Sequence, residues 1–199
     1  LSFESCLSIR SIAESKAALG SAVDLSPTLA QNEEVASLLV SHADWIDLRC
    51  RIGWSWYRLG YSSYAYEVFA AAVAASPSDA EARTGLGFAL YAQGSYDAAI
   101  AELDRALALG GRPCVFEMKV EATKPYTLRA DARTVRAWCW VRKGEWWKAL
   151  PELEEAVRKN PDWIDALCGL GWARYGGGKL DDAAEAFRKA QKLAPSHAD

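Results

Sequence analysis

Apolar residues recur with helical spacing along most of this chain, in short segments separated by Gly or Pro. Every second segment carries a small residue, a bulky apolar residue and another small residue at offsets of four and three. These offsets place all three side chains on one face of a helix. The four triplets are Ala65–Phe69–Ala72, Ala99–Leu103–Ala106, Ala149–Leu153–Ala156 and Ala183–Phe187–Ala190. The pattern predicts four amphipathic helices that each bury this face.

A second stretch precedes each of these helices and also recurs along the chain. It reads Trp-Ser-Trp-Tyr-Arg-Leu-Gly in its first copy and ends in Gly in all copies: 54–60, 88–94, 138–144 and 172–178. Successive copies are 34, 50 and 34 residues apart. A fixed period of this length indicates a repeat architecture. The glycines mark turns, because Gly tolerates the positive φ at the end of a helix.

The order of residues within one period resembles the tetratricopeptide repeat. Its clearest copy contains Leu170-Gly171, Gly178, Ala183, Phe187, Ala190 and Pro195. The resemblance implies an all-α fold, a right-handed superhelical α-solenoid of antiparallel helix pairs whose first helices line a concave groove. Stacking is needed because one helix pair cannot bury its apolar faces alone.

The resemblance also divides the chain into segments. An N-terminal helical pair, either a cap or a degenerate repeat, is expected at 1–44. The four units are expected at 45–79, 80–111, 130–163 and 164–199, with an insertion at 112–129.

Apolar and polar residues alternate between Cys114 and Glu121 within this insertion, which favours extended chain. Two interpretations remain open. The insertion is a loop that packs Phe116 and Met118 onto adjacent helices, or a flap that covers the groove or pairs with a partner strand.

Charge and composition exclude several classes of partner. The chain has 199 residues, with 23 Lys and Arg against 26 Asp and Glu and a net charge of −3, so we expect no nucleic-acid partner. Its apolar runs fall far short of the roughly 20 residues that span a bilayer, so we expect no membrane insertion. Five cysteines without a C-x-x-C pair favour free thiols.

The compartment stays open. The chain begins with Leu1, which indicates a piece of a longer protein. We favour the cytoplasm, with the periplasm as the alternative if the piece comes from an envelope protein.

No arrangement of residues predicts catalysis. The two histidines, His42 and His197, lack a recognisable Ser or Cys nucleophile with a carboxylate. Gly176-Gly177-Gly178 follows a helix rather than opening one after a strand, so it is a turn and not a phosphate loop. We therefore expect no enzyme activity, no metal and no cofactor.

The resemblance implies which residues face the groove. Ten of them form the predicted ligand-binding set: Trp54, Tyr57, Phe88, Tyr91, Trp138, Trp172, Tyr175, Asp47, Arg58 and Arg142. The rings suit an apolar or proline-rich segment, an amphipathic helix, or sugar rings. The competing interpretation is that some or all rings pack as core between first helices. Four further tryptophans are expected to pack in the core or between repeats: Trp56, Trp140, Trp146 and Trp147.

An acidic residue also recurs near the start of each first helix, at Asp47, Glu81, Asp131 and Asp165. This row could select a basic ligand. We favour the other account, in which each carboxylate stabilises the N-terminal end of its helix.

The sequence thus predicts a non-enzymatic scaffold that binds a partner peptide or helix in an aromatic-lined groove. One alternative is a glycan-binding module of a polysaccharide assembly or export system, and another is an architectural segment of a larger repeat protein. The C-terminal end carries no polar capping helix, so we expect further repeats there or a homo-oligomer formed through this end.

Overall fold

The structure is a computed structural model that describes residues 35, 37, 42, 44–110, 116–120 and 126–194. For 116–120 and 126–130 it describes the backbone only. The N-terminal pair expected at 1–44 lies almost wholly outside the described residues, as do Pro195 and His197.

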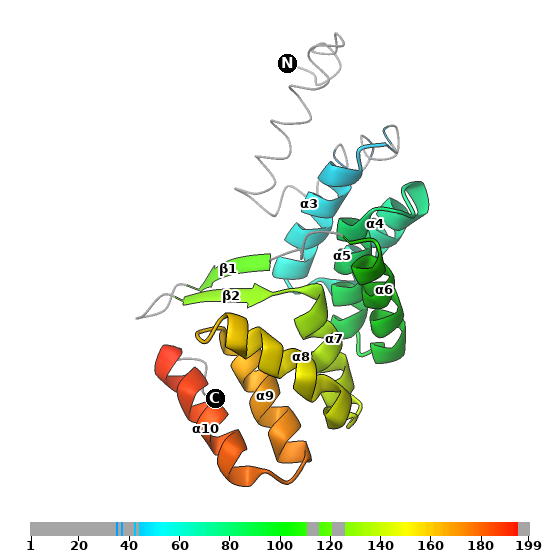
Figure 1. Cartoon of the computed structure of the whole chain (residues 1–199). Coiled ribbons are helices and arrows are strands. Elements are labelled where there is room, and N and C mark those ends of the chain that lie inside the picture. The colour runs from blue at the N-terminus through cyan, green and yellow to red at the C-terminus, as the bar shows by residue number, and fades with distance from the viewer. Residues whose placement is uncertain are drawn as a thin grey trace.

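The described residues form four antiparallel helix pairs that follow one another in a curved array (Figure 1). The pairs are α3 (Ile46–Arg58) with α4 (Ser62–Ala75), α5 (Ala80–Ala92) with α6 (Tyr96–Ala108), α7 (Ala132–Arg142) with α8 (Trp146–Lys159), and α9 (Ile164–Gly176) with α10 (Leu180–Leu193). Each first helix packs against its own second helix, and α3, α5 and α7 also pack against the first helix of the next pair. The prediction of an α-helical solenoid is confirmed.

The turn within each pair has the geometry that the recurring glycine predicts. Gly60 has φ +83°, and Gly94, Gly144 and Gly178 lie close to this value. At the first turn the amide of Tyr61 donates to the Trp56 carbonyl at 3.0 Å, and the amide of Gly60 donates to the Tyr57 carbonyl at 3.0 Å. These two bonds satisfy carbonyls that the end of α3 would otherwise leave unpaired.

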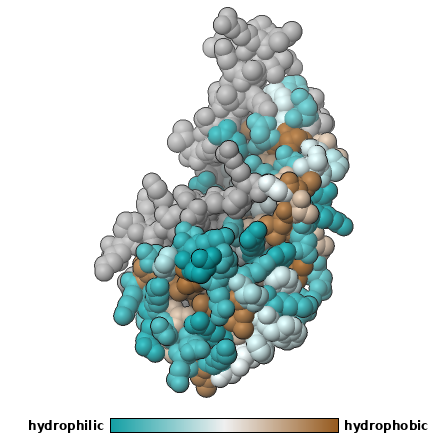
Figure 2. Space-filling model, in the orientation of Figure 1, coloured by the Kyte–Doolittle hydropathy of each residue, from teal (hydrophilic) through white to brown (hydrophobic). Residues whose placement is uncertain are grey.

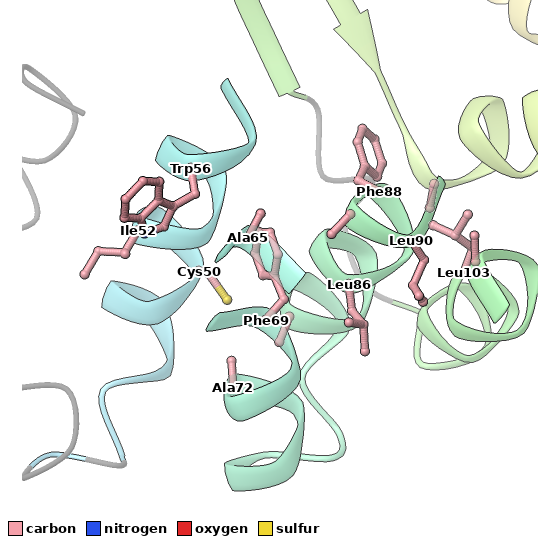
Figure 3. Packing of buried hydrophobic residues seen from close by; sticks show 14 of the residues in the cluster. Cys50, Ile52, Trp56, Ala65, Phe69, Ala72, Leu86, Phe88, Leu90 and Leu103 are labelled. Carbon is pink, nitrogen blue, oxygen red and sulfur yellow. The ribbon is translucent and has the colours of Figure 1, made fainter. Parts of the chain in front are cut away.

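The second-helix triplets supply much of the core. Phe69 extends from α4 into the space between α3 and α5, and it is fully buried together with Ala65 and Ala72 (Figure 3). Two triplet members, Ala156 and Phe187, are only partly buried. Outside the core, Figure 2 shows hydrophilic side chains over most of the described surface in that view, with apolar groups between them.

A β-hairpin interrupts the array between α6 and α7. Strands β1 (Phe116–Val120) and β2 (Tyr126–Ala130) are antiparallel, with Phe116 opposite Ala130 and Val120 opposite Tyr126. The alternation from Cys114 to Glu121 thus corresponds to a strand over the five residues of β1. Strand β2 packs against α9 and leads through Asp131 directly into α7 (Figure 1).

Two aspartates fix the starts of first helices. The Asp79 carboxylate accepts a hydrogen bond from the Ala82 amide at 2.8 Å, and the Asp131 carboxylate accepts one from the Thr134 amide at 2.7 Å. Such N-caps satisfy amides that lack a partner within the helix. Asp131, one of the acidic row, therefore stabilises the start of α7.

Candidate partner-binding face

All ten predicted ligand-binding residues lie on the first helices α3, α5, α7 and α9. We call the surface formed by these four neighbouring helices the first-helix face. Its rings do not form one continuous exposed row. They divide into a packed group on α3 and α5, a tethered tryptophan on α7 and an exposed pair on α9.

The packed group is centred on Phe88. The Trp54 ring lies edge-on to Phe88 and to Phe69, each with centroids 5.1 Å apart, and Tyr57 lies 5.7 Å from Phe88. Phe88 is only 1% exposed, whereas Trp54 and Tyr57 are half-buried. The structure therefore places Phe88 in the core between α3 and α5, beneath the surface on which a ligand would rest. The core interpretation holds for this ring.

Burial raises the pKa values of two tyrosine hydroxyl groups at this cluster. Burial, together with the nearby charges of Tyr91 and Asp165, raises the pKa of Tyr57 to about 12. Burial also raises the pKa of Tyr91, against the opposing effect of its hydrogen bond with Arg142.

Trp138 is held between α7 and α9. Its indole Nε1 donates to the Asp165 carbonyl oxygen at 3.2 Å, and its ring lies against Gly169. Trp138 is half-buried, so one edge still reaches the surface. Its indole N–H already has an acceptor within the chain.

Trp172 and Tyr175 are the open pair of the face. Trp172 is 51% exposed and Tyr175 57% exposed. The two rings meet edge-on with centroids 5.9 Å apart, and Trp172 also meets Phe187 of α10 edge-on at 5.5 Å. These contacts fix the position of the indole while leaving much of its surface in water.

The three charged residues of the predicted set are exposed. Asp47 lies in the first turn of α3, whereas Arg58 and Arg142 lie in the last turns of α3 and α7. Each charge complements the dipole at its end of the helix. Arg142 is also held by Tyr91, which raises the pKa of the guanidinium further.

Glu81, another member of the acidic row, lies against Trp54. Burial raises the pKa of the Glu81 carboxyl, while a hydrogen bond with Trp54 acts in the opposite direction. Asp131 forms an N-cap hydrogen bond and Glu81 contacts Trp54. At least two members of the acidic row therefore interact with other groups of the chain.

Sequence reasoning misjudged one tryptophan and missed two features of the surface. Trp147 on α8 is 56% exposed, so the prediction that it packs inside is wrong. Tyr61 and Tyr64 are exposed around Trp56, and Tyr64 stacks on that indole at 4.7 Å. Phe187 of α10 packs against Trp172 of the open pair. A usable signal existed for Phe187, since only it and Phe69 place an aromatic ring at the bulky position of the triplets.

Among the described residues, no group of three or more His, Cys, Asp or Glu side chains could hold a metal ion. Cys50 and Cys139 are buried, and burial raises the pKa of the Cys139 thiol to about 12. No helix in this part of the chain is long and apolar enough to cross a membrane.

Comparison with solved structures shows the same fold in other proteins. MamA from Desulfovibrio magneticus RS-1 is 25% identical, with a TM-score of 0.56 over 75% of this chain and 76% of that one. A further MamA crystal structure is 24% identical, with a TM-score of 0.60 over 96% and 98% of the two chains. PilW, described as a widely conserved type IV pilus biogenesis factor, is 21% identical, with a TM-score of 0.67 over 92% and 78%.

The family comparison agrees with the architecture. Tetratricopeptide repeat models match residues 64–112 and 141–198, which together make up more than half of the chain. No curated protein sequence matches this one. Two repeat matches, four stacked helix pairs and the recurring Gly turns lead to one assignment. This chain belongs to the tetratricopeptide repeat family.

Proposed function

We propose that this chain is a non-enzymatic scaffold that binds a segment of a partner protein on its first-helix face. The repeat architecture supports an interaction scaffold in general terms. The finer proposal rests on one observation: Trp172 and Tyr175 expose more than half of their surface on a face whose other rings are largely packed.

Exposed rings in fixed positions favour binding over a structural role. An aromatic side chain that leaves water contributes more than most residues to an interface, and it loses little conformational freedom when it is already held. Phe187 and Tyr175 hold Trp172 from two sides. Binding a partner would therefore bury apolar surface at a low entropic cost.

The other predicted ligand-binding residues contribute to the proposed interface to different degrees. Trp54, Tyr57, Tyr91 and Trp138 contribute their exposed edges, while Phe88 supports them from below. Asp47, Arg58 and Arg142 form a charged rim that carries both signs, so the partner segment need not be strongly acidic or basic. Rim charges of this kind influence the association rate and specificity more than the affinity.

Glycan binding is the alternative, since an exposed indole can stack on a sugar face. The open pair meets at 84°, so Trp172 and Tyr175 cannot both lie flat on one sugar ring. A wedge of two perpendicular rings fits a side chain or the ridge of a helix better.

A displayed peptide library selected on the immobilised protein tests the proposal. We expect selected peptides to lose about tenfold or more in affinity for the Trp172→Ala protein, as is usual for an aromatic anchor. Trp147→Ala is the matched control, because this tryptophan is equally exposed on α8, and it should change affinity by less than about twofold.

Two results would contradict the proposal. The first is a selection that yields no peptide. The second is a set of peptides whose binding is unaffected by Trp172→Ala, Tyr175→Ala and Arg142→Ala together. An oligosaccharide array run with the same proteins tests the alternative, and binding to sugars but not to peptides would favour it.

A further inference from the structure

The chain builds the same aromatic trio twice. Trp54, Tyr57 and Phe69 form the first trio on α3 and α4, and Trp172, Tyr175 and Phe187 form the second on α9 and α10. The Trp–Tyr centroids are 6.0 Å apart at 87° in the first and 5.9 Å apart at 84° in the second. The Trp–Phe centroids are 5.1 Å apart at 70° and 5.5 Å apart at 75°.

The backbone beneath the two trios also matches. A Cβ atom added to Gly53 would lie 2.7 Å from the Phe69 ring, and one added to Gly171 would lie 2.6 Å from the Phe187 ring. In both pairs of helices, glycine lets the ring lie directly on the first helix.

Helix α5 covers the first trio with three residues. Phe88 packs edge-on against Trp54 and Tyr57. Gly85 lies on the Phe69 ring so closely that any side chain there would clash with it. Glu81 accepts a hydrogen bond from Trp54. Glu81, Gly85 and Phe88 are spaced by four and three residues and therefore share one face of α5.

No helix in the described part of the chain covers the second trio. Phe69 is fully buried, whereas Phe187 is only partly buried. Trp54 and Tyr57 are half-buried, whereas Trp172 and Tyr175 are exposed. The difference in exposure corresponds to the cover that α5 gives the first trio, because the geometry within the two trios is nearly the same.

We propose that the trio on α9 and α10 docks a helix from a partner protein with the surface pattern of α5. That helix carries a side-chain acceptor, then glycine four residues later, then an aromatic residue three residues after the glycine. The acceptor receives the Trp172 indole N–H, the glycine lies on the Phe187 ring, and the aromatic residue packs against Trp172 and Tyr175. This inference rests on the proposed function and specifies the partner for its open pair.

A partner protein is the occupant that fits best. The site continues the interface that already joins α3 to α5, α5 to α7 and α7 to α9. A second copy of this chain could not supply α5, because Gly85 and Phe88 are buried within its own fold. We assign the helix to a partner protein in which this pattern is free. The assignment is overturned if a longer form of this chain continues beyond residue 199 into a repeat that covers Trp172, Tyr175 and Phe187.

The probe is a synthetic peptide of residues 79–93 with blocked ends and a fluorescent label. A hydrocarbon staple between positions 83 and 87, on the opposite face of the helix, keeps it helical, since so short a peptide is otherwise marginal in water. Fluorescence anisotropy with the full chain measures binding. We expect saturable binding that Trp172→Ala weakens at least about tenfold and Trp147→Ala leaves within about twofold.

Peptide variants test the pattern itself. Gly85→Leu should abolish binding, because its side chain meets the Phe187 ring, and Phe88→Ala should weaken binding about tenfold. The proposal is overturned if both variants bind like the parent peptide or if Trp172→Ala changes nothing. It is also overturned if sedimentation shows that the chain alone forms a dimer that Trp172→Ala dissociates, since the occupant would then be a second copy.

The experiments distinguish a failure of the α5-like partner from a failure of the proposed function. If library peptides depend on Trp172 and Tyr175 but the stapled helix does not bind, only the α5-like partner is wrong. If no selected peptide depends on the first-helix face and the stapled helix also fails, the proposed function is wrong as well.

Discussion

At the scale of single residues, glycine and phenylalanine are matched across the interface between units. The Phe69 ring fills the space that Gly53 and Gly85 leave open on two different helices. Phe69 is fully buried. The position therefore depends on the absence of a side chain on both neighbours.

Gly85→Ala tests this match. The added Cβ would clash with the buried Phe69 ring, and we expect a loss of about 1–3 kcal/mol in the free energy of unfolding, as for other overpacked cores. Urea unfolding measures it. Combining Gly85→Ala with Phe69→Leu should cost less than the sum of the two single changes. Strict additivity would show that the ring and the new methyl group do not meet.

Tyr57 gives a prediction about pH. Folding raises its pKa from about 10 to about 12 and so favours the neutral phenol. This contribution to stability is fully present below pH 10 and is lost as the pH rises towards 12. Raising the pKa from about 10 to about 12 corresponds to a loss of about 3 kcal/mol once Tyr57 is fully ionised.

Urea unfolding between pH 9 and 11.5 measures this loss for the wild type and for Tyr57→Phe. The variant cannot ionise at this position, so its stability should fall less steeply over that range. Cys139, whose pKa is also about 12, is present in both proteins and cancels in the comparison. Equal slopes would rule out Tyr57 as a source of alkaline destabilisation.

Residue spacing predicted position but not exposure. Phe88 and Trp172 hold the same place in the repeat, yet one is 1% exposed and the other 51%. The difference comes from whether packing encloses the ring, which depends on side chains far along the chain. Periodicity within one helix contains no information about that covering.

At the scale of helices and strands, unit three has a charged side chain at a first-helix position where the other units have an apolar residue. Arg136 stands at the position of Ile52, Leu86 and Leu170. Its guanidinium forms ion pairs with Glu152 of α8 and Asp104 of α6, and it lies 5.0 Å from the Trp140 ring centroid. One side chain on α7 thus connects three helices.

Removing one partner should cost more than removing both. Glu152→Ala leaves a partly buried guanidinium with only the exposed Asp104, and we expect a loss of about 2 kcal/mol in unfolding free energy. The double variant Arg136→Leu/Glu152→Leu should lie closer to the wild type, because apolar residues replace the pair.

Lys148→Ala is the matched control for thermal or urea unfolding. It removes an exposed ion pair with Glu145 and should change stability by less than about 0.5 kcal/mol. A double variant that is less stable than Glu152→Ala alone would contradict the argument.

The helices were predictable because each carries a strong local signal in its apolar spacing and its terminal glycine. In the insertion, the alternation around Phe116 to Val120 predicted extended chain. The second strand, Tyr126–Ala130, was not predicted. Its existence depends on pairing with β1, and its position depends on packing against α9, so no short stretch of sequence contains that information.

At the scale of the whole molecule, the stack is a row of helix pairs, and each described pair packs mainly against the pairs next to it. Inner pairs such as α5–α6 pack on both sides. Within the described chain, the α9–α10 pair packs on one side and leaves its aromatic trio open. Stability in such arrays is close to a sum over units and the interfaces between them.

Hydrogen exchange should therefore differ along the array. We expect amides of α10 to exchange faster than those of α6, because the outer pair opens without breaking a second interface. Mass spectrometry after deuterium labelling measures the rates. Adding the stapled peptide should slow exchange in α9 and α10 while leaving α6 unchanged. Equal protection of α6 and α10 in the free protein would mean that the stack opens as one unit.

The paired trios also give this chain an internal spectroscopic reference. Trp54 and Trp172 have the same Tyr and Phe neighbours at nearly the same angles, and they differ in whether a further helix covers them. In protein labelled with 5-fluorotryptophan, Trp54 reports the ¹⁹F chemical shift of the covered state. A ligand that completes the stack should move the Trp172 resonance towards that of Trp54, so one spectrum would distinguish a helix seated like α5 from any other mode of binding.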